Sequence, residues 1–315
     1  MRVSILAGGL SHERDVSIRS GRRVWESLID AGMDAVVHDV DADLLSAWYI
    51  EPPVVAIPML HGAAGEDGSL RDVIESLGIE YVGSTPDACR MAFDKPIAKA
   101  IVSAAGIATP KAVALPHATF RELGADAVIK TVVEAVSLPI IVKPTKGGSS
   151  LGVSVVREQR ELASALVAAY AYGDVALIEH FVEGTEVAVS IIERDGMPVA
   201  LPAVEICPDG GFYNYTARYT AGTTEFFAPA RLDGDTANAV ADVALRAHAA
   251  LGLRDISRTD LIVDREGVVW FLEVNVAPGM TETSLFPQAV AAAGLELGSV
   301  LRELVEAAAR RTVNA

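Results

Sequence analysis

The chain has 315 residues, of which 51% are hydrophobic and 22% charged, and its formal net charge is −16 at neutral pH. A chain of this size buries roughly three quarters of its unfolded surface on folding, which is enough for two or three domains. The acidic balance and the absence of runs of lysine and arginine exclude nucleic acid as a partner, because counterion release needs clustered cations. A nucleotide needs only a few local cations and remains compatible with this composition.

The two cysteines, Cys89 and Cys207, lie far apart and belong to no CxxC or Cys/His pattern. This usage is typical of free thiols in a reducing compartment. The apolar opening of the chain is short and runs into the charged segment His12–Asp15, so it predicts a first buried strand and not a signal peptide. No apolar stretch reaches the ~20 residues that cross a bilayer. We therefore expect a cytoplasmic protein that has no membrane partner.

The first ninety or so residues alternate apolar runs with helical patterns. Val3–Ala7 and Val54–Met59 are continuous apolar runs, and Ser17–Ala31 has helical spacing followed by a glycine. This alternation predicts a parallel sheet that is covered on both faces. Ligands of such sheets bind at the carboxyl ends of the strands. The loops Gly8–Asp15 and His61–Gly68 both follow such ends and are therefore candidate binding loops.

From about residue 94 the pattern changes to hairpins mixed with helices. The strand Pro139–Lys143 leads through a glycine-rich turn to the strand Gly152–Val156, which predicts a β-hairpin. A polar loop spans Asp209–Thr224. The helices expected here are Lys95–Ala105, Glu161–Ala171, Thr236–Leu251 and Leu295–Ala309, and the other strands include Val175–Phe181 and Glu186–Ile192.

The strongest chemical signal lies in two apolar strands on either side of the turn Asp264–Gly267. If the turn pairs its two end residues, position 260 lies opposite 271 and position 258 lies opposite 273. A two-residue shift of this register keeps the same side chains on one face, whereas a one-residue slip separates them. The polar residues that share this face are Arg258, Asp260, Glu273 and Asn275.

Two carboxylates and an amide oxygen on one face suit Mg²⁺, which takes few protein oxygens and completes its octahedron with water and phosphate. We therefore interpret Asp260, Glu273 and Asn275 as a divalent-metal site. The alternative is a polar hairpin face that is paired with neighbouring cations. Burying Glu-x-Asn among apolar residues without a ligand costs free energy, which favours the metal site.

Two further segments are suited to a nucleotide. Lys143–Gly152 joins two strands with glycines and serines, and it is not a Walker A loop because no helix opens with Gly-Lys-Ser/Thr. Its backbone N–H groups and hydroxyls are suited to phosphate oxygens as a mobile lid, and Lys143 supplies charge. Leu177–Glu186 ends an apolar strand and is suited to an adenine slot, in which Glu186 accepts from ribose hydroxyls. The alternatives are an ordinary Gly/Ser hairpin and a strand that leads into a solvated loop.

Taken in order, these segments resemble the D-alanine–D-alanine ligase family of the ATP-grasp superfamily, over essentially the whole chain. The sequence HGAAGEDG at His61–Gly68 combined with EVNVAPGMT at Glu273–Thr281 is highly specific. The other segments that carry the resemblance are Gly8–Ser17, Phe93–Lys95, Val142–Ser150, Phe212–Tyr219 and Arg258–Asp260.

The resemblance implies an α/β chain with an ATP-grasp fold, which has α+β character in its ATP-binding part. It implies an N-terminal parallel-sheet substrate domain over residues 1–92, a central lid domain over 93–180 and a C-terminal catalytic domain over 181–315. The implied reaction starts when the carboxylate of one D-alanine attacks the γ-phosphate of ATP. The amine of a second D-alanine then attacks the acyl phosphate, which gives D-alanyl-D-alanine for peptidoglycan precursors, ADP and phosphate. Phosphoryl transfer depends mostly on positioning and charge neutralisation, which agrees with lysines and metal ligands as the main signals.

The family match also assigns the nucleotide site. Lys95 and Lys143 are expected to hold the ATP phosphates, and Ser149 and Arg218 belong to the same cofactor-binding set. The metal ligands would bind two Mg²⁺ ions, which Mn²⁺ can replace. The residues expected to line the adenosine site are Glu179, His180, Val182 and Glu186.

Substrate contacts carry over in the same way. Glu13 matches the carboxylate that faces the ammonium group of the first D-alanine, with an ion pair to Arg14 or Arg19 as the alternative. His61 is expected to bind substrate because of its setting in HGAAGEDG, with a loop histidine that has satisfied hydrogen bonds as the alternative. The remaining catalytic and acceptor-side residues are Ser149 and Tyr219 in a hydroxyl network with Glu13, Arg258 and the N–H of Gly279 as oxyanion stabilisers, and Ser284 and Leu285 around the second substrate's carboxylate.

Several positions depart from the family pattern. Arg218 replaces a usual lysine, and Glu282-Thr283 replaces a common Ser-His before the acceptor pocket. Gly147 replaces an acidic residue in the lid, and Arg71-Asp72 replaces Gln-Gly. Tyr219, in contrast, favours an amine acceptor because depsipeptide-forming relatives tend to lack it.

These departures leave a runner-up open, namely an ATP-grasp ligase for another D-amino acid or biosynthetic amine. A nucleotide-binding module without ligase activity is a third reading. A dinucleotide-dependent dehydrogenase is disfavoured because no GxGxxG follows the first strand. A homodimer is expected from the family resemblance alone.

Overall fold

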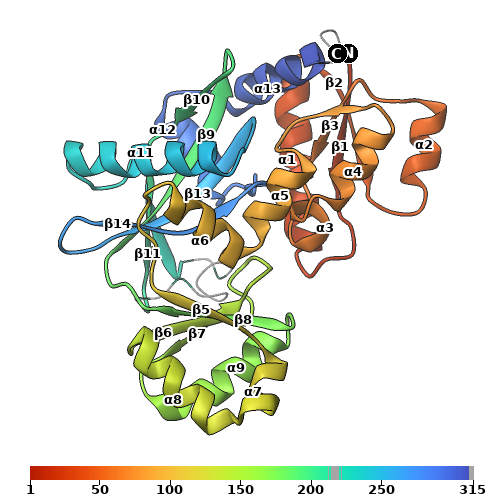
Figure 1. The fold of residues 1–315 in the computed structure, drawn as a ribbon. Helices are drawn as coiled ribbons and strands as arrows, with labels where there is room; N and C mark the ends of the chain where they lie inside the picture. Colours follow the sequence, from red (N-terminus) through yellow and green to blue (C-terminus); the bar gives the residue numbers. More distant parts are fainter. Residues whose placement is uncertain (212, 214–219, 221, 312–315) are drawn as a thin grey trace.

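Three sheets organise the part of the chain that the computed structural model describes, which comprises residues 1–211, 213, 220 and 222–311 (Figure 1). The first sheet belongs to the N-terminal part of the chain, the second to the middle and the third to the C-terminal part. Within these described ranges, no helix is both long and apolar enough to cross a membrane.

The N-terminal sheet is fully parallel, as the alternation of strands and helices predicts. Its strand order is β2-β1-β3-β4, and β1 pairs in parallel with both β2 and β3. The sequence reading missed β2, whose mixed polar pattern follows its half-exposed position at the sheet edge. The strands are β1 (Arg2–Ala7), β2 (Asp34–Asp39), β3 (Val55–Pro58) and β4 (Glu80–Tyr81), and the helices between them are α1 (Arg14–Asp30), α2 (Leu44–Ile50), α3 (Ala63–Glu66) and α4 (Ser69–Ser76).

The second sheet has the order β5-β8-β6-β7 and is antiparallel, and its helices lie on one side of it at the bottom of Figure 1. The predicted hairpin around the glycine-rich turn is confirmed, because β6 pairs antiparallel with β7. The strands are β5 (Ala112–Pro116), β6 (Ile140–Pro144), β7 (Ser154–Val156) and β8 (Val175–His180). The helices are α7 (His117–Leu123), α8 (Ala125–Val136), the 3₁₀ turn η1 (Gln159–Glu161) and α9 (Leu162–Tyr170).

The third sheet is also antiparallel, with the order β12-β11-β9-β13-β14 and with β10 paired to β9. Its strands are β9 (Thr185–Arg194), β10 (Met197–Ala200), β11 (Val204–Pro208), β12 (Thr224–Phe227), β13 (Ile256–Val263) and β14 (Val269–Asn275). The helices that cover it are α5 (Pro86–Phe93), α6 (Lys95–Ala104), α11 (Gly234–Ala250), α12 (Leu285–Ala292) and α13 (Leu297–Arg311).

Helix caps fix where the helices over this sheet begin. Thr85 accepts a hydrogen bond from the N–H of Ala88 at the start of α5, and Asp94 caps α6. A side-chain oxygen at this position satisfies an N–H group that the helix leaves unpaired. Because α6 begins directly after Asp94, Lys95 and Lys99 lie one turn apart on the same helix face.

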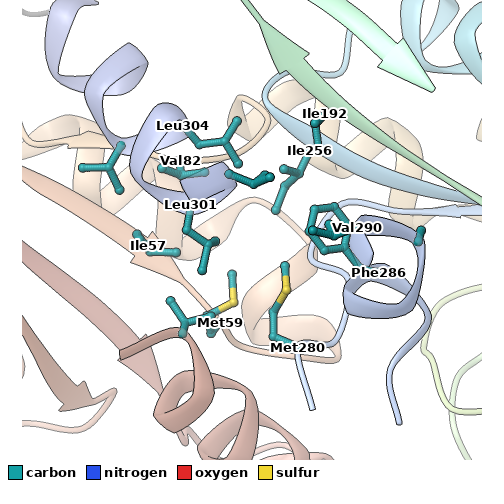
Figure 2. Packing of buried hydrophobic residues seen from close by; sticks show 14 of the residues in the cluster. Ile57, Met59, Val82, Ile192, Ile256, Met280, Phe286, Val290, Leu301 and Leu304 are labelled. Atoms are coloured by element: carbon teal, nitrogen blue, oxygen red, sulfur yellow. The ribbon is translucent and has the colours of Figure 1, made fainter. Parts of the chain in front are cut away.

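One hydrophobic core joins the beginning and the end of the chain (Figure 2). Ile57 and Met59 from the N-terminal part meet Phe286 of α12 and Leu301 of α13 in this cluster, and all four are almost fully buried. Burying side chains of this size contributes roughly 1.5–3 kcal/mol each. The last helix therefore anchors the N-terminal sheet to the third sheet, while the division of the chain at residues 92 and 180 stays a prediction.

Candidate active site

Two adjoining cavities lie between the sheets. The first cavity, of about 330 Å³, lies between β6 and β8 on one side and β13 and β14 on the other. The second cavity, of about 470 Å³, lies between the loops of the N-terminal sheet and the third sheet. The residues that line both of them are Lys95, Gly147, Gly148, Tyr213 and Glu273.

The β13–β14 hairpin forms the wall between the cavities, and its register corrects the one expected from the sequence. Leu261 pairs with Phe271, so the strands are slipped by one residue near the turn. The register then shifts again between positions 260 and 261, and Asp260 lies directly opposite Glu273. The bulge at Leu272 turns a one-residue slip into a two-residue shift, which restores the predicted face.

The four polar residues of the hairpin therefore lie on one face as two opposed pairs. Arg258 pairs with Asn275 across the strands, and Asp260 pairs with Glu273. Arg258 donates from Nε and Nη2 to both carboxylate oxygens of Asp260 at 2.7 and 2.9 Å. Although burial alone would lower it, the pKa of Arg258 is raised by this carboxylate, so the guanidinium stays charged.

The donor set of this face fits a hard divalent cation. Asp260 is buried, the Glu273 carboxylate lies 3.2 Å from the Lys95 ammonium, and the Asn275 amide oxygen accepts from the N–H of Ala277. Two carboxylates and one amide oxygen are the oxygen ligands that Mg²⁺ prefers. Among the described residues, no group of three or more His, Cys, Asp or Glu side chains is arranged to hold a metal.

A buried carboxylate in the lining of the first cavity holds two lysines, of which only Lys143 also lines that cavity. Glu179 lies 2.5 Å from the Lys143 ammonium and 2.9 Å from that of Lys99. Burial would lower the pKa of Lys143, but Glu179 and Glu273 hold it above its usual value, so this lysine is charged. Burial lowers the pKa of Lys99. The sequence reading assigned Lys143 and missed Lys99, although its position four residues after Lys95 was a visible signal.

The predicted adenosine residues are brought together in the first cavity. Glu179, His180, Val182 and Glu186 all line it, from the end of β8 and the start of β9. Arg218 and Tyr219 lie outside the described residues.

The glycine-rich turn reaches across to the N-terminal part of the chain. The Ser149 hydroxyl donates to the Glu13 carboxylate, although 136 positions separate them in the sequence. A Cβ atom on Gly148 would come within 3.3 Å of the same carboxylate, so a larger residue there would press against Glu13. The Lys95 ammonium also donates to the carbonyl of Gly147 at 2.8 Å. The turn therefore connects Glu13 to the lysine shared by both cavities.

Among the described contacts, the Glu13 carboxylate forms no ion pair with the neighbouring Arg14 or Arg19. Arg14 forms its ion pair with Asp39 instead, and the Arg19 guanidinium donates to the backbone carbonyl of Asp15. The alternative in which Glu13 pairs with Arg14 or Arg19 does not occur among the described contacts. Glu13 lines the second cavity.

His61 lines the second cavity but is bonded to the protein through both ring nitrogens. Its Nδ1 lies 3.1 Å from the carbonyl oxygen of Ala277, which can only accept, so Nδ1 carries the proton. Its Nε2 lies 3.1 Å from the Ser20 hydroxyl, which therefore donates to it. Burial lowers the pKa of His61 to about 4, so the ring is neutral. Its two hydrogen bonds connect Ser20 of α1 with Ala277 of the loop after β14.

The far end of the second cavity is formed by the loop before α12. The Ser284 hydroxyl accepts from the N–H of Thr281 at 2.9 Å, and a Cβ on Gly279 would come within 2.9 Å of it. Gly279, Ser284 and Leu285 line the cavity, so all three predicted residues are together here. Glu282 is exposed and does not belong to the lining.

Residues 101–306 match the sequence profile of a family described as D-ala D-ala ligase C-terminus, which is well over half of the chain. The chain belongs to the D-alanine–D-alanine ligase family. A family member from Pelotomaculum thermopropionicum, a D-alanine–D-alanine ligase, is 39% identical over 308 residues, covering 98% of this chain and 96% of the relative. The family predicted from the sequence motifs is therefore confirmed.

Solved structures of the family share the whole architecture. The D-alanine–D-alanine ligase from Bacillus anthracis complexed with ATP has a TM-score of 0.80 and 29% identity, covering 100% of this chain and 99% of that one. The VanG D-Ala:D-Ser ligase from Enterococcus faecalis has a TM-score of 0.83 and 26% identity, covering 97% of this chain and 98% of that one. These likenesses confirm the ATP-grasp fold expected for the D-alanine–D-alanine ligase family.

Proposed function

We propose that the chain is an ATP-dependent D-alanine–D-alanine ligase, which forms the dipeptide through an acyl phosphate for peptidoglycan precursor synthesis. The observation that carries this proposal is the meeting of the two cavities at Lys95 and Glu273. A cavity lined by three lysines, Lys95, Lys143 and Lys146, suits ATP, and a cavity lined by Glu13 suits an amino acid with a free ammonium group. Their shared wall is where the γ-phosphate would face the carboxylate of the first D-alanine.

In the first step, the chain positions charge around the phosphates. The first D-alanine carboxylate attacks the γ-phosphorus, the bond to the ADP oxygen breaks, and ADP leaves. Lys95 and Lys143 are placed to neutralise the phosphate oxygens, and the Ser149 turn covers them. Asp260, Glu273 and Asn275 would hold the Mg²⁺ ions, which supply further neutralisation of charge when bound.

In the second step, the amine of the second D-alanine attacks the acyl carbon. The carbonyl oxygen becomes an oxyanion, for which Arg258 and the N–H of Gly279 are the proposed donors. Arg258 uses Nε and Nη2 for Asp260, and Nη1 is not part of that pair. Donors of this kind contribute roughly 3 kcal/mol each. The attack forms the C–N bond, and collapse of the oxyanion then breaks the C–O bond to phosphate while the nitrogen loses a proton, which leaves the amide. Ser284 and Leu285 would face the acceptor carboxylate.

The test is product identification with purified protein, ATP and Mg²⁺. Phosphate release is expected to require D-alanine, and mass spectrometry is expected to show the D-alanyl-D-alanine dipeptide. Equal phosphate release with L-alanine would refute the stereochemical part of the proposal. Phosphate release that is independent of any amino acid would refute the ligase itself.

A second candidate acceptor is another D-amino acid. The likeness to a D-Ala:D-Ser ligase and the presence of Thr283 in the cavity lining support it. Incubation with an equimolar mixture of D-amino acids and D-hydroxy acids decides between the candidates. A mixed dipeptide as the main product would replace D-alanine as the acceptor, whereas a depsipeptide would overturn the amine acceptor.

From the family resemblance alone, we further propose a cytoplasmic homodimer. Light scattering on the purified protein is expected to give the mass of two chains. The mass of one chain at assay concentration would overturn the dimer.

A further inference from the structure

A second carboxyl group lies beside Glu13 in the second cavity. Glu66 ends the short helix α3, its side chain is only 7% exposed, and it lines the same cavity as Glu13. The Glu66 carboxyl accepts the N–H of Gly62 at 2.9 Å, and a Cβ on Gly62 would come within 3.0 Å of the Glu13 carboxylate. The two carboxyl groups therefore flank one glycine, which leaves no side chain between them.

The cations that face Glu66 are engaged by other groups. Lys95 of α6 pairs with Glu273, and Arg258 of β13 pairs with Asp260. From α4, the buried Arg71 donates to the carbonyl of Gly65, directly before Glu66 in the chain. The remaining titratable neighbours are His61, which is neutral, and the buried thiol of Cys89 on α5, whose pKa is raised by burial. Within the described residues Glu66 forms no ion pair of its own.

This environment favours the protonated form of Glu66. Burial is the largest cause and the nearby Glu13 carboxylate the second, and together they raise the pKa of Glu66 to about 8. The N–H of Gly62 and the more distant Lys95 and Arg258 oppose this shift but do not cancel it. At neutral pH the Glu13–Glu66 pair therefore carries one proton and one negative charge.

We propose that Glu66 is a second carboxyl of the donor subsite, the part of the cavity where Glu13 faces the first D-alanine, and that donor binding displaces its proton. The donor enters as an ammonium cation, the O–H bond of Glu66 breaks, and the proton leaves to solvent. The loss of this proton adds one negative charge to the Glu13–Glu66 pair, and the ammonium group of the donor compensates for the added charge. This inference rests on the proposed function, because it takes the donor ammonium to bind beside Glu13.

A consequence is that donor binding tightens as the pH rises towards 8. Between pH 7 and pH 8 the deprotonated fraction of a group with a pKa of about 8 rises roughly fivefold. The apparent donor constant, measured from initial rates over a wide range of D-alanine at saturating ATP, is expected to fall by roughly that factor. The substrate ammonium itself stays protonated in this range.

The variant Glu66→Gln tests the inference. Glutamine keeps an oxygen that accepts the N–H of Gly62 but has no acidic proton, so the donor constant is expected to lose its change between pH 7 and pH 8. The matched control is Glu75→Gln, which removes an exposed carboxylate of α4 outside both cavities and is expected to keep the wild-type dependence. An unchanged pH dependence in the Glu66 variant would overturn the proposal.

A second measurement needs no variant. Titration calorimetry of D-alanine into the protein with MgADP, in two buffers of different ionisation enthalpy, counts the protons released. We expect close to one proton at pH 7 and about half of one at pH 8. No release at either pH would overturn the proposal even if the Glu66 variant failed to fold. If no dipeptide forms at all, the proposed function fails, whereas ligase activity with a pH-independent donor constant removes only the role of Glu66.

Discussion

The two cavities differ in how their charges are balanced. At the first cavity the buried Glu179 carboxylate lies between the ammonium groups of Lys99 and Lys143, so these three charges are compensated within the protein. In the second cavity, Glu13 and Glu66 lie together beside a neutral His61. A paired charge costs less to bury than an unpaired one, whereas like charges at one place raise the cost of ionising both.

The difference matches the ligand proposed for each side. ATP brings negatively charged phosphates, to which the lysines that line the first cavity are complementary. An amino acid brings an ammonium group, and a carboxyl pair without its own cation is complementary to that group. The wall between the cavities, with Lys95 and Glu273, is the place where both arrangements meet.

The largest effect is expected at this wall. Glu273→Gln removes a proposed metal ligand and the partner of Lys95, so turnover is expected to fall at least about a hundredfold. Because the Glu273 side chain is about one third exposed, the melting temperature is expected to change little. Turnover and thermal melting of Glu266→Gln, an exposed carboxylate on the same hairpin, are the control. Full activity in the Glu273 variant would show that the metal assignment is wrong.

The two lysines that contact Glu179 are expected to have different roles, one in ATP binding and one in stability. Lys143→Met is expected to raise the KM for ATP and to lower turnover by one to two orders of magnitude, because it removes a phosphate contact. Lys99→Met leaves Glu179 with its Lys143 partner, so it is expected to cost stability, about 3 kcal/mol, more than turnover. Steady-state kinetics and denaturant unfolding of both variants separate the two roles. Equal losses of turnover would contradict the distinction.

His61, which lines the second cavity, is expected to make the free energy of unfolding of the chain depend on pH. The unfolded chain protonates this histidine near pH 6.5, whereas the folded chain resists protonation until about pH 4. Acid therefore favours the unfolded state across this window, by up to roughly 3 kcal/mol. The loss of stability between pH 7 and pH 5 is expected to be smaller in His61→Gln than in the wild type. The same loss in both would show that His61 is not held neutral.

The smallest effect is expected at Glu282. Its side chain is exposed and lies outside the cavity lining, so the departure from the family pattern does not place a carboxylate against the acceptor. Glu282→Gln is expected to change kcat/KM for D-alanine by less than about twofold, within the range of ordinary surface substitutions. A tenfold improvement would instead show that this carboxylate repels the acceptor.

The hairpin shows how far the sequence could be used. Strand alternation correctly predicted Asp260 and Glu273 on one face, because side chains alternate between the two faces and a two-residue shift of register leaves each on its own face. The register itself was wrong, since the bulge at Leu272 leaves no mark in an apolar run. The helix that Asp94 caps was predicted to within one residue, whereas α5, which Thr85 caps, was not predicted.

Contacts between residues far apart in the chain could not be predicted from the sequence, for a physical reason. The bond between Ser149 and Glu13 and the bridge from His61 to Ala277 join segments that only the folded core brings together. Family motifs named Glu13 and His61 as site residues, but not what their atoms contact. Glu66 was inside the most specific motif and was still missed, because a glutamate in a loop gives no sign of being buried.

The central claim is that the first D-alanine is activated as an acyl phosphate where the two cavities meet. The most direct test uses D-alanine labelled with ¹⁸O in its carboxylate, followed by mass analysis of the phosphate released with unlabelled ATP. One carboxylate oxygen bridges to phosphorus and leaves with it, so one ¹⁸O per phosphate is expected. Dipeptide formation with unlabelled phosphate would contradict the account.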